Sequence, residues 1–243
     1  MVTFSWAGAT DIGLVRRTNQ DAVLPDDMGL GPGPVVVAVA DGLGAYAGSE
    51  IASRLVIDAI STCPADEMNP EQLVAVAHQR LTDHIEVVEK IHPALVNMST
   101  TLTLAILRPG GLIEIGHIGD SRAYGSDGLG IAQLTTDHTI AMDLVRAGRL
   151  AARDAAGHPG WHTMSNWLGR EHRYWVETHA LVFGRGDRLL LCSDGLSNLV
   201  PEDVIGGLLY AGTPDESCTA LIDAANRAGG SDNISVVVVS VEM

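Results

Sequence analysis

The chain has 243 residues, 46% of them hydrophobic and only 4% aromatic, and its formal net charge is −15. This length predicts one domain over residues 1–243, large enough to bury a sizeable core. The excess of acidic side chains argues against nucleic acid or an anionic membrane as the main partner, and no apolar run approaches the roughly 20 residues of a membrane-spanning helix.

The first hundred residues predict strands followed by two helices. Short apolar runs predict strands near residues 2–9, 13–15, 22–24 and 35–40. In the first helix, apolar residues recur at helical spacing from Ile51 to Ile60, and Ser49 is expected to be its cap. The second helix is expected to begin at Asn69-Pro70, because proline suits the first turn of a helix.

The rest of the chain predicts hairpins, one long excursion and two helices. The expected strands lie near residues 100–107, 111–118, 121–125, 131–134, 175–183, 188–192 and 233–241. Residues 135–174 form the excursion, and helices are expected near 201–209 and from Thr213-Pro214 onward. Because hairpins rather than single helices separate most strands, an antiparallel α+β sandwich is favoured over a parallel sheet.

Five aspartates stand where a predicted strand meets a turn: Asp21, Asp41, Asp120, Asp194 and Asp232. Any single Asp-Gly pair is most simply a turn signal. The ends of several strands can meet at one rim, however, and buried carboxylates repel one another unless a positive group neutralises them. Oxygen ligands without His or Cys suit hard divalent cations such as Mg²⁺ or Mn²⁺. The pattern therefore predicts a metal-centred hydrolytic site.

Seven sets of residues carry a resemblance that covers nearly the whole chain. They read DIGLVRRTNQD (11–21), VADGLG with GSEIAS (39–44 and 48–53), STT (99–101), HIGDSR (117–122), LTTDH (134–138), CSDGL (192–196) and SDNISVV (231–237). With these motifs in this order, the chain resembles the protein phosphatase 2C (PPM) family, in its compact bacterial form of metal-dependent Ser/Thr protein phosphatase. The resemblance implies a four-layer α-β-β-α sandwich of two mainly antiparallel sheets flanked by helices.

The resemblance also implies a set of metal ligands at one end of the sheets. Asp41 would bridge two ions of Mn²⁺ or Mg²⁺, and the carbonyl oxygen of Gly42 would bind the second. Asp194 and Asp232 would hold the first ion. Asp120 would help to form a third, weaker metal site.

Further roles follow from the same resemblance. Arg16 matches the phosphate-binding arginine of the family, whose planar fork suits two phosphate oxygens. Asp21 would orient metal-bound water. Gln20 stands where the family often has Glu, so the second ion is expected to be held more weakly or through water. Asp21 is also expected to reach a metal ion through water. The excursion at 135–174 occupies the place of the family's flap, which influences substrate access.

Two departures from the family pattern follow the Asp41-Gly42 pair. Leu43 stands where some relatives carry a His proposed to protonate the leaving alcohol, so no general acid is assigned. Ala45-Tyr46 replaces a frequent Gly-His, which leaves the shape of that loop open. The core ligand set is intact.

The predicted function is the hydrolysis of phospho-Ser and phospho-Thr in proteins by a water that two metal ions activate. The expected partners are a phosphoprotein substrate and an opposing bacterial Ser/Thr kinase, and the chain is expected to be a monomer. No Cys with Arg six residues later, no Asp-x-Asp pair and no Gly-x-x-x-x-Gly-Lys loop occurs, which disfavours other phosphate-handling classes. The alternative, which Gln20 motivates, is a catalytically weakened phosphatase-fold binding or regulatory protein.

The cysteines and histidines suggest no additional site. Three cysteines at unrelated positions, without a recognisable signal peptide, favour a cytoplasmic location. Cys192 is expected to be a small core residue, and His117 to have a core or hydrogen-bonded role. His158 and His162 have the i,i+4 spacing of a metal pair, but Pro159 between them argues against a metal-binding helix.

Overall fold

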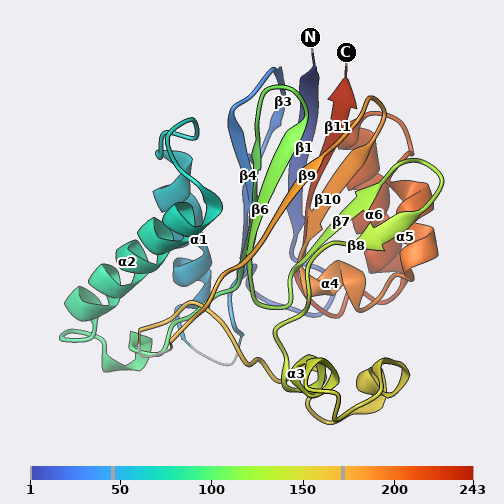
Figure 1. The fold of residues 1–243 in the computed structure, drawn as a ribbon. Coiled ribbons are helices and arrows are strands. Elements are labelled where there is room, and N and C mark those ends of the chain that lie inside the picture. Colours follow the sequence, from blue (N-terminus) through green and yellow to red (C-terminus); the bar gives the residue numbers. More distant parts are fainter. Residues whose placement is uncertain (1, 45–46, 171–172, 243) are drawn as a thin grey trace.

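The computed structural model describes residues 2–44, 47–170 and 173–242, which form two stacked β-sheets with helices on both outer faces (Figure 1). The six-stranded sheet has the order β3 (Met28–Gly31), β1 (Thr3–Asp11), β11 (Ile234–Glu242), β10 (Arg188–Cys192), β7 (Arg122–Ser126) and β8 (Ile131–Gln133). The five-stranded sheet has the order β2 (Asp21–Leu24), β4 (Val35–Asp41), β5 (Leu102–Leu107), β6 (Leu112–Ile118) and β9 (Glu177–Val182). Neighbouring strands run antiparallel. The predicted α-β-β-α sandwich is confirmed.

Helices cover the outer face of each sheet (Figure 1). The five-stranded sheet is covered by α1 (Ser49–Ser61) and α2 (Pro70–Val88), and the six-stranded sheet by α4 (Asp194–Ser197), α5 (Glu202–Leu208) and α6 (Pro214–Arg227). A short 3₁₀ turn, η1 (Pro93–Leu95), follows α2. The excursion contains α3 (Ile140–Arg146) and the 3₁₀ turn η2 (Ala152–Gly157), and it lies beyond one end of the sheets. None of the helices within the described ranges combines the length and the apolar character that a membrane crossing needs.

The apolar runs that predicted the strands are buried on both of their faces. Val37 and Val39 of β4 point between the two sheets, where they meet Leu191 of β10. Val36 and Ala38, which alternate with them, pack on the helix side of the same sheet. Because successive side chains of a strand point to opposite faces, a strand covered on both sides reads as a continuous apolar run. The double burial makes the sheets a rigid base for the turns at their ends.

Two expectations about the first strands are wrong. Residues 13–15 form no strand, because the backbone N–H of Leu14 donates to the carbonyl oxygen of Gly230 at 2.7 Å instead of joining a ladder. Conversely, β3 has no counterpart among the predicted strands. Two of its four residues are glycine, and the indole of Trp6 packs so closely over Gly29 that a side chain at residue 29 would overlap it.

Helix capping agrees with the sequence in two places and differs in one. Asn69 and Thr213 each begin a full capping box, at α2 and α6. Ser49, however, is the first residue of α1 and not its cap. Gly48, with φ of +83°, occupies the cap position, and the Ser49 hydroxyl donates to the carbonyl oxygen of Leu43 at 2.5 Å. Ser49 therefore fixes the turn after the Asp41-Gly42 pair.

The five aspartates gather at the end of the sandwich opposite the two chain termini (Figure 1). Each stands at a strand end or just beyond it: Asp21 begins β2, Asp41 ends β4, Asp120 lies between β6 and β7, Asp194 follows β10 and Asp232 precedes β11. Antiparallel order brings the end of one strand beside the start of the next. The topology therefore collects carboxylates from the whole length of the chain.

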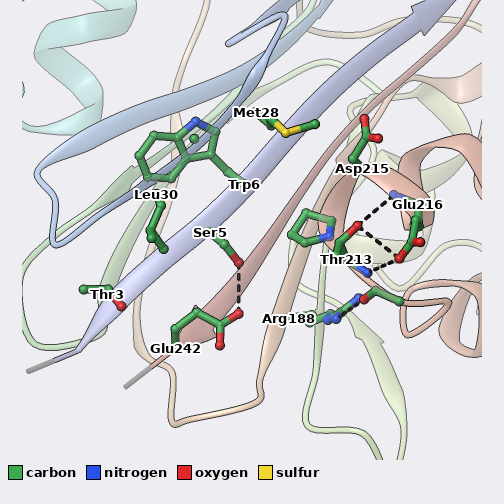
Figure 2. A pocket seen from close by; sticks show the side chains of 13 residues that line it. Thr3, Ser5, Trp6, Met28, Leu30, Arg188, Thr213, Asp215, Glu216 and Glu242 are labelled. Atoms are coloured by element: carbon green, nitrogen blue, oxygen red, sulfur yellow. Dashed lines mark hydrogen bonds between the residues drawn. The ribbon is translucent and has the colours of Figure 1, made fainter.

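A separate groove of about 1220 Å³ lies near the termini, between β1, β3 and the start of α6 (Figure 2). Exposed Met28 and Leu30 line it. Several of its polar groups already bond one another: the Ser5 hydroxyl donates to Glu242 at 3.0 Å, and the carboxylate of Glu216 caps α6. The groove lies at the other end of β1 from the aspartates.

The inter-sheet core provides a test of stability. Leu191 is fully buried, so Leu191→Ala is expected to lower the free energy of unfolding by roughly 2–5 kcal/mol through lost burial and a residual cavity. Leu129→Ala is the matched control, because that leucine is 95% exposed and should change stability by about 0.5 kcal/mol or less. Denaturant titration measures both values, and equal losses would contradict this account of the core.

Candidate metal centre

An acidic cleft of about 490 Å³ opens at the aspartate end of the sheets. Its lining residues come from six separate stretches of the chain: Arg16, Gln20, Asp41, Gly42, Leu43, Gly44, Asp120, His162, Met164, Asp194, Asn198, Ser231, Asp232 and Asn233. Of the residues predicted for the site, only Asp21 is not part of this lining. It is 5% exposed and lies directly across from Asp41 in the β2–β4 register. The structure therefore brings the predicted set together.

The backbone of Asp41 is held by the threonines of the STT segment. The N–H of Asp41 donates to the hydroxyl of Thr101 at 3.0 Å. Its carbonyl oxygen accepts from the hydroxyl of Thr100 at 2.9 Å and from the N–H of Thr101 at 2.8 Å. With both backbone groups satisfied, the Asp41 side chain is presented to the cleft from a fixed point.

Gly42 lies where no side chain fits. A Cβ at this position would overlap the carbonyl oxygen of Ser49 and would stand 2.7 Å from that of Gln20. The N–H of Gly42 donates to the same Gln20 oxygen at 3.1 Å, and the hydroxyl of Ser53 donates to it at 2.6 Å. The glycine after Asp41 is therefore a packing requirement of this rim and not only a turn signal.

Asp194 and Asp232 are brought together by close backbone packing. A side chain at Gly195 would overlap the carbonyl oxygen of Asn233, so the start of α4 packs directly on the segment that carries Asp232. The amide of Asn233 ties this segment to the first loop, because its Nδ2 donates to the carbonyl oxygens of Ile12 and Thr18 at 3.0 and 3.1 Å. The segment that carries Asp232 is thus fixed both to the start of α4 and to a loop more than 200 positions away.

Two hydrogen bonds join Gly119, the residue before Asp120, to His138. The N–H of Gly119 donates to Nδ1 of His138 at 3.1 Å, and the N–H of His138 donates to the carbonyl oxygen of Gly119 at 2.7 Å. Nδ2 of Asn166 also lies 2.9 Å from Nδ1 of His138. Because His138 is 1% exposed, it supports the turn before Asp120 from within the protein.

Burial and mutual repulsion disfavour the charged form of these carboxylates. Burial, followed by the charges of neighbouring aspartates, raises the pKa of Asp41 and of Asp120 well above the usual range. Burial also raises the pKa of Asp21 to about 7, against the hydroxyls of Ser193 and Ser235, which lower it. The pKa of Asp194 is raised by burial and by Asp232. Converging buried oxygen donors of like charge match a hard divalent cation, which would relieve both costs.

Several of the carboxylates have other partners. The guanidinium of Arg16 contacts Asp232, with Nη2 2.6 Å from Oδ2, and Nδ2 of Asn198 donates to Asp194 at 3.1 Å. Among the described residues, no three His, Cys, Asp or Glu side chains are already arranged to hold one ion.

Some residues of the cleft were not predicted. Asn198 stands one helical turn after Asp194, and His162 and Met164 come from the excursion. His162 lies outside any helix, as Pro159 suggested. His117 is buried and bonded to Thr103 at 2.8 Å, which confirms its predicted hydrogen-bonded role. Ala45 and Tyr46 lie outside the described residues.

Comparisons with known proteins agree on one family. A family model described as Protein phosphatase 2C matches residues 16–211. The serine/threonine protein phosphatase PstP of Mycobacterium tuberculosis is 38% identical over an alignment of 241 residues, and the match covers 97% of this chain and 45% of that protein. The chain therefore spans less than half the length of PstP.

Two further comparisons extend over nearly the full length of both chains compared. The serine/threonine phosphatase stp of Listeria monocytogenes is 32% identical over 95% of this chain and 93% of its own length. A solved catalytic domain of PstP, in complex with two manganese ions, is similar with a TM-score of 0.83 and 34% identity over 100% of each chain.

The raised carboxylate pKa values predict how stability depends on pH without metal. The folded pKa of Asp21, about 7, exceeds its usual value of 3.8, so its contribution to stability is present below pH 4 and is lost as the pH rises towards 7. In chelator, Asp21→Asn should become progressively more stable relative to wild type between pH 4 and 7. Thermal unfolding in a pH series measures the difference, and a difference that is independent of pH would contradict the prediction.

Proposed function

Because the chain belongs to the protein phosphatase 2C family, we propose that it hydrolyses phosphoserine and phosphothreonine in proteins and depends on a divalent metal ion. The observation that carries this proposal is the convergence of four buried or half-buried aspartates on one cleft whose rim holds Arg16. A cleft that is acidic and yet takes a phosphate needs bound cations. The phosphatase names of PstP and stp support the same activity.

We propose that Asp41, the carbonyl oxygen of Gly42, Asp194 and Asp232 hold two ions of Mn²⁺ or Mg²⁺, with Asp120 at a third site. The manganese complex of the PstP catalytic domain supports this choice of cofactor. When bound, the ions supply a water of lowered pKa and neutralise phosphate charge. Gln20 and Asp21 stand beside the ligand set and would reach an ion through water.

Arg16 and Asp21 have distinct parts in the proposed reaction. Arg16 lies at the rim with a planar fork of donors that matches two phosphate oxygens. Asp21 lies behind Asp41, and the hydroxyl of Ser193 donates to it at 2.8 Å, so its carboxylate has a fixed orientation for accepting a bond from the attacking water. Leu43 offers no proton to the leaving alcohol, so no side chain is assigned as general acid, and solvent or a water on a metal ion would be the default proton donor.

The alternative of a weakened regulatory protein rests on Gln20. The backbone carbonyl oxygen of Gln20 accepts hydrogen bonds from Gly42 and Ser53. Because the backbone makes these bonds, having Gln instead of Glu at this position does not affect them. Its side-chain oxygen Oε1 lies close to Gly44, 2.9 Å from where a Cβ of that glycine would stand, and Nη1 of Arg16 lies 3.2 Å from the same point. The complete aspartate set favours the enzyme over the regulatory protein.

We further propose that residues 1–243 act as one catalytic unit, with residues 135–174 as the flap over the cleft. His162 and Met164 of this segment line the cleft, which supports a role in substrate access. A phosphoprotein substrate and an opposing Ser/Thr kinase are the proposed partners. A monomeric state and a cytoplasmic location remain predictions from the sequence.

Removing a ligand tests the metal-dependent reaction. Asp194→Asn is expected to lower kcat on an aryl phosphate by about a hundredfold or more, because one carboxylate of the ion site becomes neutral. Chelator should abolish wild-type turnover, and Mn²⁺ should restore it. Asp223→Asn, an exposed position on α6, is the control and should behave as wild type. Equal turnover by the wild type and Asp194→Asn would contradict the assignment.

Arg16 is tested by separating KM from kcat. Arg16→Ala is expected to raise KM for a phosphopeptide by roughly tenfold to a hundredfold, the effect of losing a charge-assisted hydrogen bond. The adjacent Arg17→Ala removes the same charge one residue away and should leave KM within about twofold of wild type. Steady-state kinetics at saturating Mn²⁺ measure both. A wild-type KM in Arg16→Ala would exclude its phosphate-binding role.

A further inference from the structure

A cluster of exposed apolar side chains precedes Arg16. Ile12, Leu14 and Val15 are 39, 68 and 66% exposed, and they occupy the loop that follows β1. Single exposed apolar residues are common on protein surfaces. These three lie within four positions and directly before a residue of the cleft, and such a concentration of exposed apolar side chains on one loop is a candidate binding surface. We refer to residues 12–15 as the rim patch.

Short contacts hold the rim patch in place. The N–H of Gly13 donates to Asp11 at 2.8 Å, and the N–H of Leu14 donates to the carbonyl oxygen of Gly230 at 2.7 Å. Gly13 has φ of +75°, and a side chain on it would overlap the carbonyl oxygen of Asp232. These bonds fix the backbone of the rim patch, and its apolar side chains are exposed in this conformation.

The rim patch is continuous with the acidic cleft. The side chain of Leu14 packs against Gly230, with its Cγ 2.8 Å from where a Cβ of that glycine would stand. The next residue, Ser231, lines the cleft. On the other side of the patch, Arg16 reaches the cleft and contacts Asp232. A phosphorylated side chain bound by Arg16 would therefore bring its neighbouring residues onto the patch.

The charge of the protein restricts which neighbours would bind well. The chain carries 30 acidic and 15 basic residues, and carboxylates line the cleft itself, so acidic flanking residues would be repelled. Apolar flanking residues would instead gain from burial against Leu14 and Val15. A strand rises about 3.3 Å per residue, so only the first two or three neighbours of the phosphorylated residue can reach.

We propose that the rim patch determines substrate specificity, by binding apolar side chains that flank the phosphorylated residue of the substrate. This inference rests on the proposed phosphatase function. The occupant is an extended phosphopeptide segment with Leu, Ile or Val within about three positions of the phospho-residue. The rim patch would add a preference for the residues around the phosphorylated side chain. Metal ions and Arg16 cannot supply this preference, since they recognise only the phosphate.

The experiment compares two phosphopeptides that differ only in flanking residues, leucine in one and serine in the other, with an aryl phosphate as reference. Wild type should favour the leucine peptide by about tenfold in kcat/KM, the scale of partial burial of one apolar side chain. Leu14→Ser and Val15→Ser should each reduce this preference to about threefold or less, mainly through KM. Leu129→Ser, at a leucine that is 95% exposed on the turn between β7 and β8, should retain it.

The outcomes separate the inference from the function beneath it. Phosphate release with equal kcat/KM on both peptides, or a preference that survives both rim-patch variants, would overturn the inference alone. No release from any of the three substrates in the presence of Mn²⁺ would overturn the proposed function, and the inference with it. A patch that instead joins two copies would appear as a dimer in wild type that Leu14→Ser dissociates, with no change in peptide preference, and this too would overturn the inference.

Discussion

Repulsion among buried carboxylates is the constraint on which this structure depends. Asp21 and Asp41 face each other across two paired strands, and Asp120, Asp194 and Asp232 stand close to them. Where carboxylates are partly removed from water, each negative charge raises the cost of the next. An end of the sheets that carries several neighbouring negative charges must be stabilised by the residues around it, and cation binding would stabilise it further.

The stabilising surroundings are the two sheets and the small polar residues behind the cleft. Side chains such as Val39 and Leu191 fill the layer between the sheets, while Thr100, Thr101 and Asn233 satisfy the backbone at the rim. Apolar packing fixes where the strands end, and hydrogen bonds fix the turns beyond them. Substitutions in either group are then felt at the cleft without touching a carboxylate.

Most of the fold could be predicted from sequence, because strands buried on both faces leave long apolar runs. β3 could not, since Met28–Gly31 alternates glycine with exposed side chains and is placed by its pairing with β1 and by the packing of Trp6 on Gly29. For the site, the aspartates were predictable as strand-end residues, and their assignment to particular ions came from the family resemblance. Asn198 and His162 left no comparable signal, because their positions at the cleft depend on how α4 and the excursion pack.

The carboxylate of Asp232 contacts the guanidinium of Arg16 and is also a proposed ligand of a metal ion. The guanidinium and the ion would therefore compete for it. A cation that took the Asp232 oxygen would release the guanidinium, and a phosphate that attracted the guanidinium would release the oxygen. Thermodynamic linkage requires the two effects to be equal in size. The cation and the phosphoryl group would thus bind with positive cooperativity, and the side chain of Asp232 would couple the two binding events.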